Sequence, residues 1–234
     1  QRLLERFLEP MNALAVAAGG PSQRALLGQG WRYLLQNHPH DSICGCSIDP
    51  VHREMTTRFE KLSGLGRGVE HFAWMHLAPD EEGRSGDDRR LTFFNPSPFA
   101  RDEVVTCDVS FFRQRVVIGL NPDVVPDAPL PRAAGFVLED ADGRAVPFEV
   151  VDRRDDAGID YTRYDYPAQS RVERFTVRVA LEALPPLGLR TLRVRRTGAF
   201  PAPPEAGLRC DGDTVENAHL RVTARADGTF FVTD

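Results

Sequence analysis

Lysine is almost absent from this 234-residue sequence, because Lys61 is the single lysine among 29 basic residues and all the others are arginine. This skew is typical of genes from GC-rich genomes and favours a bacterial source. Acidic residues outnumber basic ones, 34 to 29, which gives a net charge of −5. Without a basic surface, nucleic acid and anionic membranes are poor candidate partners.

Long apolar runs and a cysteine framework are also missing. The sequence has no run of eighteen apolar residues that could form a membrane-spanning helix, and no charged segment followed by an apolar leader. Its four cysteines, at positions 44, 46, 107 and 210, show no regular spacing, and a Cys-x-Cys pair does not easily bridge to itself. These absences predict no membrane partner and a reducing, cytoplasmic setting.

A methionine start is lacking as well. The sequence begins at Gln1, and its first methionine, Met11, lies inside a helical pattern. We therefore expect it to be a piece of a longer protein. Its hydrophobic fraction of 41% and charged fraction of 27% are those of a globular chain, long enough for one large domain or two small ones.

Apolar residues at helical spacing predict three helices in the first third of the sequence. The first covers residues 3–15, is interrupted at Glu9–Pro10 and ends before Gly19–Gly20. The second starts near Pro21 and ends near residue 37, and the third runs from Pro50 to about residue 77. Three amphipathic helices with short connections predict a bundle. In this bundle one apolar stripe would pack against another, with Trp31, Leu34 and Leu35 facing Val51, Met55 and Phe59.

The character of the sequence changes after a charged, glycine-containing stretch at residues 79–90, which is typical of a domain boundary. Short β-branched and aromatic runs follow, separated by turn-forming residues, and they predict an antiparallel β-sandwich. A proline-rich linker at 200–204 then precedes a hairpin with its turn at Asp227–Gly228. The seven runs are 91–94, 104–109, 116–118, 136–139, 146–151, 175–179 and 191–194.

The predicted fold class is therefore α+β and multidomain. We expect a three-helix domain at 1–79, a linker at 80–90, a small antiparallel β-sandwich at 91–199, and a linker with the opening hairpin of a truncated β-sandwich at 200–234. A two-stranded hairpin cannot close a core, so more of the last domain should follow.

The side chains best suited to bind a metal or to act as acids and bases lie between the second and third predicted helices. Positions 36–54 there read QNHPHDSICGCSIDPVHRE. This stretch holds three of the six histidines and two of the four cysteines. Pro39 removes a backbone donor and ends one helix, and Asp49–Pro50 is a good helix start. Residues 38–48 are therefore predicted to form a connection anchored at both ends, whose side chains can point into a cleft.

Three interpretations of this connection are open from the spacing alone. His38, His40 and His52 can be ordinary polar residues at helix ends, with Asp41 a solvated turn residue. His40 and the two cysteines at 44 and 46 can form a structural zinc knuckle. Tetrahedral sites, however, usually use two pairs of closely spaced ligands, such as Cys-x2-Cys or His-x3-His, and only one such pair is present. Alternatively, His40 donates one ligand to a metal whose other ligands lie elsewhere.

The run WRYLLQNHPHDSICGCSIDPVHREMTTRF closely resembles the helical middle segment of glycoside hydrolase family 38, the retaining α-mannosidases, and in particular its bacterial branch. Later stretches agree with this resemblance. FFNPSPFARDEVV is similar to the first pair of strands after the helices, and ALPPLGLRTLRV to a recurrent strand entry. NAHLRVTARADGTFFVTD is similar to the opening hairpin of the large C-terminal β-sandwich. Together these stretches cover most of the chain in the order of the family.

The resemblance implies an enzyme that hydrolyses α-linked mannosides with retention and uses one zinc ion. It implies that His40 is a zinc ligand and that Asp41 contacts sugar hydroxyls, whereas the cysteines and His38 take no ligand role and His52 is structural. The nucleophile, the acid/base and the other zinc ligands of the family lie in an α/β domain that precedes these helices, and nothing in residues 1–234 matches that domain. We therefore expect no catalytic residue here, and this piece alone should be inactive.

An alternative of another class is a carbohydrate-binding or structural module that carries a His-Asp turn. Tyr161, Tyr164 and Tyr166 form the one aromatic cluster that could stack on a sugar, although an ordinary loop accounts for them equally well. The partners implied by the family are an α-mannoside and the missing catalytic domain of the same chain, and a homo-oligomer stays open.

Overall fold

A computed structural model describes residues 1–78, 88–116, 128–160, 168–202 and 207–234. The chain divides into two compact units, each made of two stretches of sequence. The first unit consists of Gln1–Glu103 and Leu181–Arg193, and the second of Val104–Ala180 and Val194–Asp234. The first carries the helices and the second carries most of the strands, so the predicted α+β class is confirmed.

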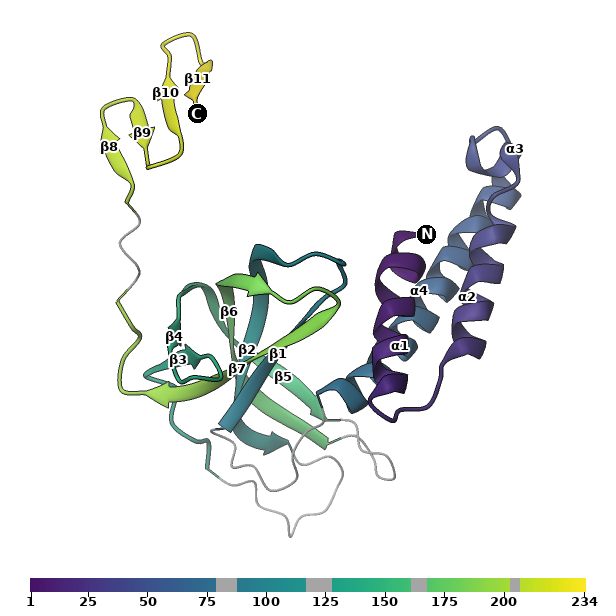
Figure 1. Ribbon diagram of the computed structural model, residues 1–234, viewed down its shortest axis with the longest axis horizontal. Coiled ribbons are helices and arrows are strands. Elements are labelled where there is room, and N and C mark those ends of the chain that lie inside the picture. The colour runs from purple at the N-terminus through teal and green to yellow at the C-terminus, as the bar shows by residue number, and fades with distance from the viewer. Residues whose placement is uncertain (79–87, 117–127, 161–167, 203–206) are drawn as a thin grey trace. The chain divides into compact units, whose positions relative to one another are not determined.

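The helices of the first unit begin with a π-helical turn and end with one long helix (Figure 1). Pro10 lies in the first turn of α1, where proline is tolerated, so the helix type changes there without ending the helical path. Pro50 occupies the same kind of position at the start of the long helix. The elements are η1 (Leu3–Leu8), α1 (Glu9–Ala17), α2 (Arg24–Gln36), α3 (His40–Ile43) and α4 (Asp49–Leu77).

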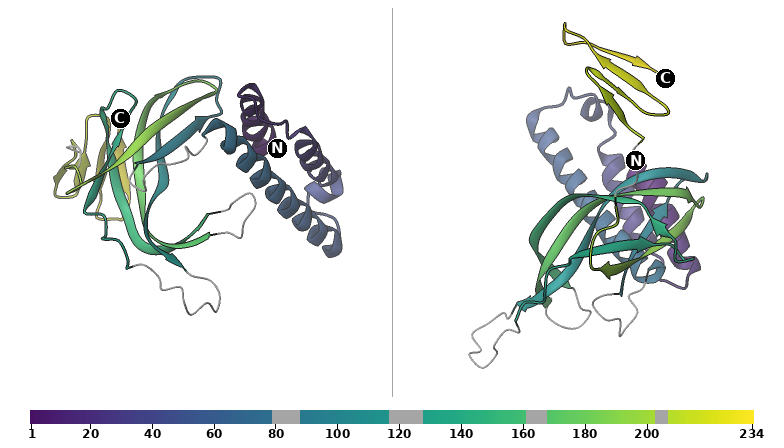
Figure 2. Two further views of the ribbon diagram at one scale, coloured as in Figure 1. Left: turned by 90° about the horizontal axis from the view of Figure 1, so that it is seen from below. Right: turned by 90° about the vertical axis from the view of Figure 1, so that its left-hand side faces the viewer.

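Helices α1, α2 and α4 lie side by side, as both views of Figure 2 and the contacts between these elements show. Their apolar stripes form a core in which α2 approaches α4 and η1 closely. A Cβ atom placed on Gly30 would lie only 3.0 Å from Leu62 Cδ1 and 3.1 Å from Leu4 Cδ2, so glycine permits this approach. The buried core residues are Leu4, Leu8, Leu27, Leu34, Leu62 and Val69, with Met11, Ala15 and Ala73 in an adjoining cluster.

The prediction that Leu35 packs against the long helix α4 is wrong. Leu34 is buried, with 4% of its surface exposed, whereas Leu35 is 57% exposed and Phe59 is 45% exposed. Each step along a helix turns the side chain by about 100°, so Leu34 and Leu35 cannot both face α4 fully. The stripe that packs is Leu27, Gly30 and Leu34, which lie three and four residues apart.

The strands are longer than the apolar runs that predicted them. Val116 is the last residue of β2 and does not begin a separate strand, and residues 117–118 of that predicted run lie outside the described part of the chain. The run at 146–151 divides between two strands. The strands that precede the C-terminal part of the chain are β1 (Asp88–Asn95), β2 (Arg101–Val116), β3 (Gly135–Glu139), β4 (Ala145–Val146), β5 (Phe148–Asp160), β6 (Ala168–Leu184) and β7 (Gly188–Thr197).

These strands form two sheets, with orders β1-β7-β3-β4 and β2-β6-β5. Strands β5 and β6 are antiparallel, and their register runs from Phe148 opposite Val179 to Asp160 opposite Ala168, with one irregularity after Val150. In the second unit the core is aromatic. Phe136 stacks on Phe148 at 4.9 Å between ring centroids and meets Phe111 and Phe175 edge-on or tilted.

The C-terminal part has four strands where a two-stranded hairpin was predicted. The expected hairpin is present as β10 (Arg221–Ala224) and β11 (Phe230–Thr233). Two short strands precede it, β8 (Arg209–Asp211) and β9 (Thr214–Glu216), and β9 pairs with β10. Three-residue strands are too short to show an alternating pattern, so the sequence did not reveal them.

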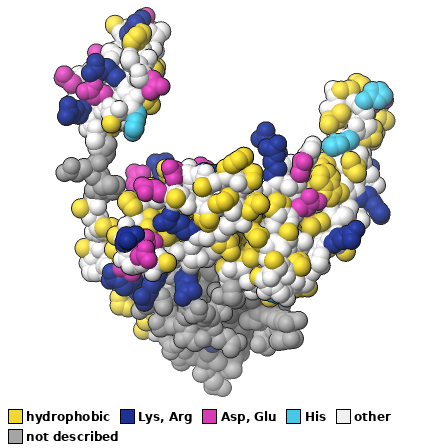
Figure 3. All heavy atoms as spheres, viewed as in Figure 1, with side chains coloured by type: hydrophobic (Ala, Val, Ile, Leu, Met, Phe, Trp, Pro, Cys, Tyr) yellow, Lys and Arg dark blue, Asp and Glu magenta, His cyan; other side chains and the backbone are white. Residues whose placement is uncertain are grey.

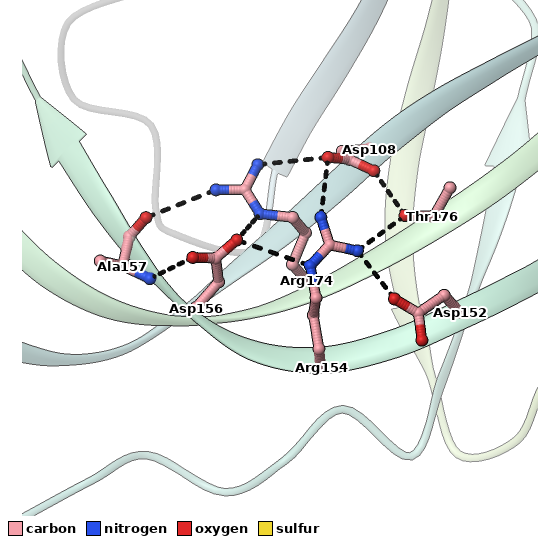
Figure 4. Close-up of polar contacts among 7 residues, drawn as sticks. All are labelled: Asp108, Asp152, Arg154, Asp156, Ala157, Arg174 and Thr176. Carbon is pink, nitrogen blue, oxygen red and sulfur yellow. Dashed lines mark hydrogen bonds and ion pairs between the residues drawn. The ribbon is translucent and has the colours of Figure 1, made fainter.

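Polar side chains also link the strands of the three-stranded sheet (Figure 4). Thr176 on β6 donates to Asp108 on β2 at 2.7 Å, and Arg174 on β6 pairs with Asp156 on β5 at 2.7 Å. Arg154 pairs with the same Asp156 and with Asp108 at longer distances. All of these groups are partly exposed, so each pair contributes little by itself, but opposite charges on adjacent strands fix the register of polar positions.

One carboxylate, Glu173 on β6, is buried among four donors. Its Oε1 accepts from Arg153 Nη2 at 2.7 Å, Arg153 Nε at 2.9 Å and Arg132 Nη1 at 3.1 Å, and its Oε2 accepts from the Ala133 amide at 2.8 Å. Burial by itself raises the pKa of Glu173, but these donors outweigh burial and hold the pKa below its ordinary value. The charged form is therefore the stable one in the folded protein.

The helical core predicts a contrast between two adjacent leucines. Leu34→Ala leaves a cavity between α2 and α4 and should lower the free energy of unfolding by about 2–5 kcal/mol. Leu35→Ala removes an exposed side chain and should change it by less than about 0.5 kcal/mol. Urea denaturation of the 234-residue chain and both variants measures the difference. Equal losses in the two variants would contradict the packing described above.

Glu173 predicts an acid-dependent stability. Glu173→Gln leaves two arginines without their shared carboxylate and should cost about 1.5–3 kcal/mol at neutral pH, while Glu149→Gln, which breaks an exposed pair with Arg178, should cost less than about 0.5 kcal/mol. Because the folded pKa of Glu173 lies below the unfolded one, its stabilisation is present above the unfolded pKa and is lost as the pH falls through the folded pKa.

The measurement for this second prediction is denaturant unfolding between neutral pH and about pH 3. The gap between the parent chain and Glu173→Gln should narrow as the solution becomes acidic. A gap that stays constant with pH would mean that the Glu173 charge does not stabilise the fold.

Candidate functional site

The connection between α2 and α4 carries the densest group of chemically active side chains, and part of it is helical. The connection predicted at residues 38–48 lies between α2 and α4, and it contains a one-turn helix that was not predicted, α3, His40–Ile43. Pro39 starts it, because its carbonyl accepts from the amides of Ser42 and Ile43, both at 3.0 Å. His40 and Asp41 are therefore the first two residues of a helical turn.

His40 and Asp41 contact each other through their side chains. His40 Nε2 lies 2.8 Å from Asp41 Oδ1, while 91% of the His40 side chain and 61% of the Asp41 side chain are exposed. Histidine side chains gather on the surface at the end of the helices that carries α3, with apolar side chains around them (Figure 3). The pair is thus ordered by its own contact and open to a ligand.

The cysteines pack against the same pair. Cys46 Sγ lies 3.6 Å from Asp41 Oδ1 and 3.3 Å from Cys44 Sγ. Contact with the Cys44 thiol raises the pKa of the Cys46 thiol above its ordinary value, and Asp41 adds to this effect. Cys46 therefore keeps its proton and acts as a donor to Asp41. Both cysteines are free and exposed.

Asn37, which the sequence marked only as a helix end, anchors this connection. It is 1% exposed, and its Nδ2 donates to the Met55 carbonyl on α4 at 3.0 Å. Arg58 Nη1 donates to Asn37 Oδ1 at 3.3 Å and to the Gln36 carbonyl at 3.4 Å. An asparagine after a helix is a common capping signal, but its burial against another helix is visible only in three dimensions.

The other histidines of the stretch lie apart from this pair. His38 is exposed just before Pro39, and His52 is partly buried in the first turn of α4. Within the described residues, no group of three or more histidine, cysteine, aspartate or glutamate side chains could hold a metal ion. The imidazole of His40 is of a kind that binds zinc as one member of a larger ligand set.

A second candidate place is a hollow of about 630 Å³ in the second unit. Its described lining includes Arg113, Asp155, Asp156 and Arg171, and no aromatic side chain is among the described residues that line it. The tyrosines at 161, 164 and 166, which the carbohydrate-binding alternative needs, lie outside the described residues. None of the site residues predicted from the sequence is among the described residues that line the hollow.

Comparison with known proteins gives a consistent result. No family model matches the chain. A crystal structure of an alpha-mannosidase from Enterococcus faecalis has a TM-score of 0.81 and 26% identity, over 100% of this chain and 27% of that one. A second Enterococcus faecalis structure, of a protein in glycosyl hydrolase family 38, has a TM-score of 0.79 and 28% identity, over 100% of this chain and 28% of that one.

A curated relative agrees with the two structures. It is a protein of Halalkalibacterium halodurans, provisionally named a mannosylglycerate hydrolase, and it is 55% identical over 62 residues, which are 26% of this chain and 7% of that protein. Over its whole length the chain is similar to a segment of these family 38 and alpha-mannosidase structures, and it is called the family 38 segment below. This family 38 segment spans about a quarter of the length of the two solved structures that it matches.

None of the described helices of the family 38 segment is both long and apolar enough to cross a membrane. Even α4, with 29 residues, carries charged side chains along its length.

The geometry of the His-Asp pair predicts weak metal binding by the segment alone. Because one histidine and one carboxylate cannot complete a tetrahedral shell, the 234-residue chain should bind zinc more weakly than micromolar and show no mannosidase turnover. Titration calorimetry with zinc checks the affinity. A stoichiometric site of submicromolar affinity would contradict this prediction. Its loss on joint substitution of Cys44 and Cys46 by serine would then identify the cysteine-containing knuckle.

Proposed function

We propose that the family 38 segment belongs to a retaining α-mannosidase and supplies one zinc ligand, His40, and one sugar-binding carboxylate, Asp41, to its active site. The observation that carries this proposal is the exposed His40–Asp41 pair, held at 2.8 Å on a turn anchored at both ends. A structural turn residue would not need a contact that leaves both side chains open to solvent.

The chemistry of His40 supports the ligand role. A neutral imidazole completes a metal shell without adding charge, and its second ring nitrogen is usually held by a carboxylate or a carbonyl. In the described structure His40 Nε2 lies 2.8 Å from Asp41 Oδ1, so Nε2 is the ring nitrogen beside the carboxylate and Nδ1 is left for another partner. With 91% of the side chain exposed, the metal's remaining ligands would come from a second surface.

Asp41 suits the recognition of sugar hydroxyls. A carboxylate is an acceptor with about four lone-pair positions, and hydroxyls are donors, so a charge-assisted hydrogen bond forms between them. Oδ1 accepts from Cys46 and lies 2.8 Å from His40 Nε2, and these two contacts orient the carboxylate. The exposed fraction of the side chain leaves the other oxygen for substrate.

The reaction itself requires groups from outside this segment. Retaining glycosidases use two carboxyl groups about 5 Å apart, one as nucleophile and one as acid/base. A zinc ion that holds two sugar hydroxyls would fix the ring in position for attack. The segment spans about a quarter of its solved relatives, which supports a catalytic domain elsewhere in the same chain as its partner. The domain boundaries given above and a cytoplasmic location belong to the same proposal.

The substrate is proposed as an α-linked mannoside. One solved relative is an alpha-mannosidase, and the curated relative bears a name that refers to mannosylglycerate, so both substrates have mannose in common. Testing an aryl α-mannoside beside mannosylglycerate on the full-length protein distinguishes a broad mannosidase from a hydrolase specific for the glycerate group.

Substitutions of His40 and Asp41 should affect zinc content and activity differently in the full-length enzyme. His40→Ala removes one of about four metal ligands, so zinc content and activity should fall together, and excess zinc should partly restore turnover. Asp41→Asn keeps the shape and leaves the metal bound, but it should lower kcat/KM by about ten- to a hundredfold without rescue by zinc. Elemental analysis and steady-state kinetics measure both effects.

The matched control is His38→Ala, which removes an exposed histidine from the same connection. It should keep zinc content and kcat/KM within about twofold of the parent. If His40→Ala behaves like this control, His40 is no ligand and the proposal loses the observation on which it rests.

A further inference from the structure

Two cysteine side chains beside the His-Asp pair lie within reach of a covalent bond. Cys44 Sγ and Cys46 Sγ are 3.3 Å apart, and both residues are exposed free cysteines. Gly45 between them has a φ of 83°, a left-handed conformation that glycine adopts without strain and that turns the chain back on itself. In such a turn the two Cα atoms are separated by about 5–7 Å, which overlaps the span of about 4.4–6.8 Å found for disulfides.

This Cys-Gly-Cys turn is hydrogen-bonded directly to His40 and Asp41. The Cys44 amide donates to the His40 carbonyl at 3.0 Å, and the Cys46 amide donates to the Asp41 carbonyl at 3.1 Å. The Cys46 thiol also contacts Asp41 Oδ1 at 3.6 Å. If a disulfide formed between the two sulfurs, it would therefore affect both the backbone and the side chain of Asp41.

We propose that Cys44 and Cys46 form a reversible disulfide in the presence of hydroperoxides, and that this bond withdraws the Cys46 hydrogen-bond donor from Asp41. Its effect on mannoside hydrolysis rests on the role proposed for Asp41, whereas the formation of the disulfide does not. The bond brings the sulfurs from 3.3 Å to about 2.05 Å and removes the S–H proton of Cys46, so Cys46 can no longer donate to the carboxylate.

The chemistry balances with hydrogen peroxide as the oxidant. The Cys44 thiolate attacks one peroxide oxygen, the O–O bond breaks, and the departing hydroxide takes up a proton as water. The resulting sulfenic acid is attacked by the Cys46 sulfur, which forms the S–S bond, and the S–O bond breaks. The hydroxide released takes the proton of Cys46 and leaves as a second water. Two thiols are oxidised by two electrons in total, and one peroxide is reduced.

The location of the pair favours a reversible bond over a permanent one. A disulfide closed across a single glycine is constrained, and exposed, constrained disulfides are the ones most easily reduced by cellular thiols. The other cysteines differ. Burial raises the pKa of Cys107 to about 11, which keeps it protonated, and Cys210 lies on the separate short strand β8.

The first test is chemical and does not depend on activity. Full-length protein is treated with hydrogen peroxide, the remaining thiols are alkylated with N-ethylmaleimide, and the protein is digested with trypsin. Cleavage after Arg32 and Arg53 releases peptide 33–53, which contains Cys44 and Cys46 and no other cysteine. We expect this peptide to lack two hydrogens and to carry no alkyl group, and dithiothreitol before alkylation should reverse both changes. Recovery of the peptide alkylated at both cysteines, or oxidised to sulfinic acid, would overturn the proposal.

The second test measures the effect on Asp41. Peroxide should lower kcat/KM on an α-mannoside by about tenfold in the parent enzyme, and dithiothreitol should restore it. Cys44→Ser and Cys46→Ser, each compared with its own untreated rate, should lose this reversible response, while Cys210→Ser should keep it. If peptide 33–53 is oxidised but the rate does not change, the link to Asp41 is wrong. If the untreated enzyme hydrolyses neither mannoside, the proposed function fails, and the peptide result alone decides the disulfide.

Discussion

Asn37 is the point on which the arrangement of the candidate site depends. A helix ends with carbonyl groups that have no partner within the helix, and a connection that follows such an end is free to vary. Asn37 removes this freedom because its buried amide donates to the Met55 carbonyl and its oxygen accepts from Arg58. The end of α2 is therefore fixed against the N-terminal third of α4. The one-turn helix α3, which begins three residues later, inherits its position from this contact.

The helices could be predicted closely because their signals are local. Pro39 and Asp49–Pro50 act on the residues beside them, and their effect does not depend on the rest of the fold. The face that each helix buries is a different matter. Leu34 and Leu35 have the same hydrophobicity, and only the crossing of α2 over α4 decides that Leu34 is inside. Periodicity gives the width of an apolar stripe, and packing selects its centre.

The long strands were underestimated for a related reason. Strands β5 and β6 continue past their apolar runs through residues such as Arg154, Asp156 and Arg174, which are neither β-branched nor aromatic. Their pairing is supported by opposite charges on adjacent strands, a relation between residues far apart in the sequence. The stretch at 36–54, in contrast, could be selected as the candidate site from its density of histidine, cysteine and aspartate residues. The contacts of Asp41 with His40 and Cys46 could not be predicted, because they depend on the turn at Gly45.

Two carboxylates in this chain show why burial and hydrogen bonding separate a structural acid from one able to bind a ligand. Glu173 accepts from four donors, which matches the roughly four lone-pair positions of a carboxylate and leaves no capacity for a ligand. Asp41 accepts one side-chain hydrogen bond, from Cys46, and pairs with His40, both at Oδ1, and in the described part of the chain no donor reaches Oδ2. The carboxylate of Glu173 in the second unit thus has hydrogen bonds on both oxygens, whereas that of Asp41 on the exposed turn of the first unit has contacts on one oxygen. An acceptor that is oriented but not saturated can exchange water for the hydroxyls of a sugar with little reorganisation, which is the property that a binding site requires.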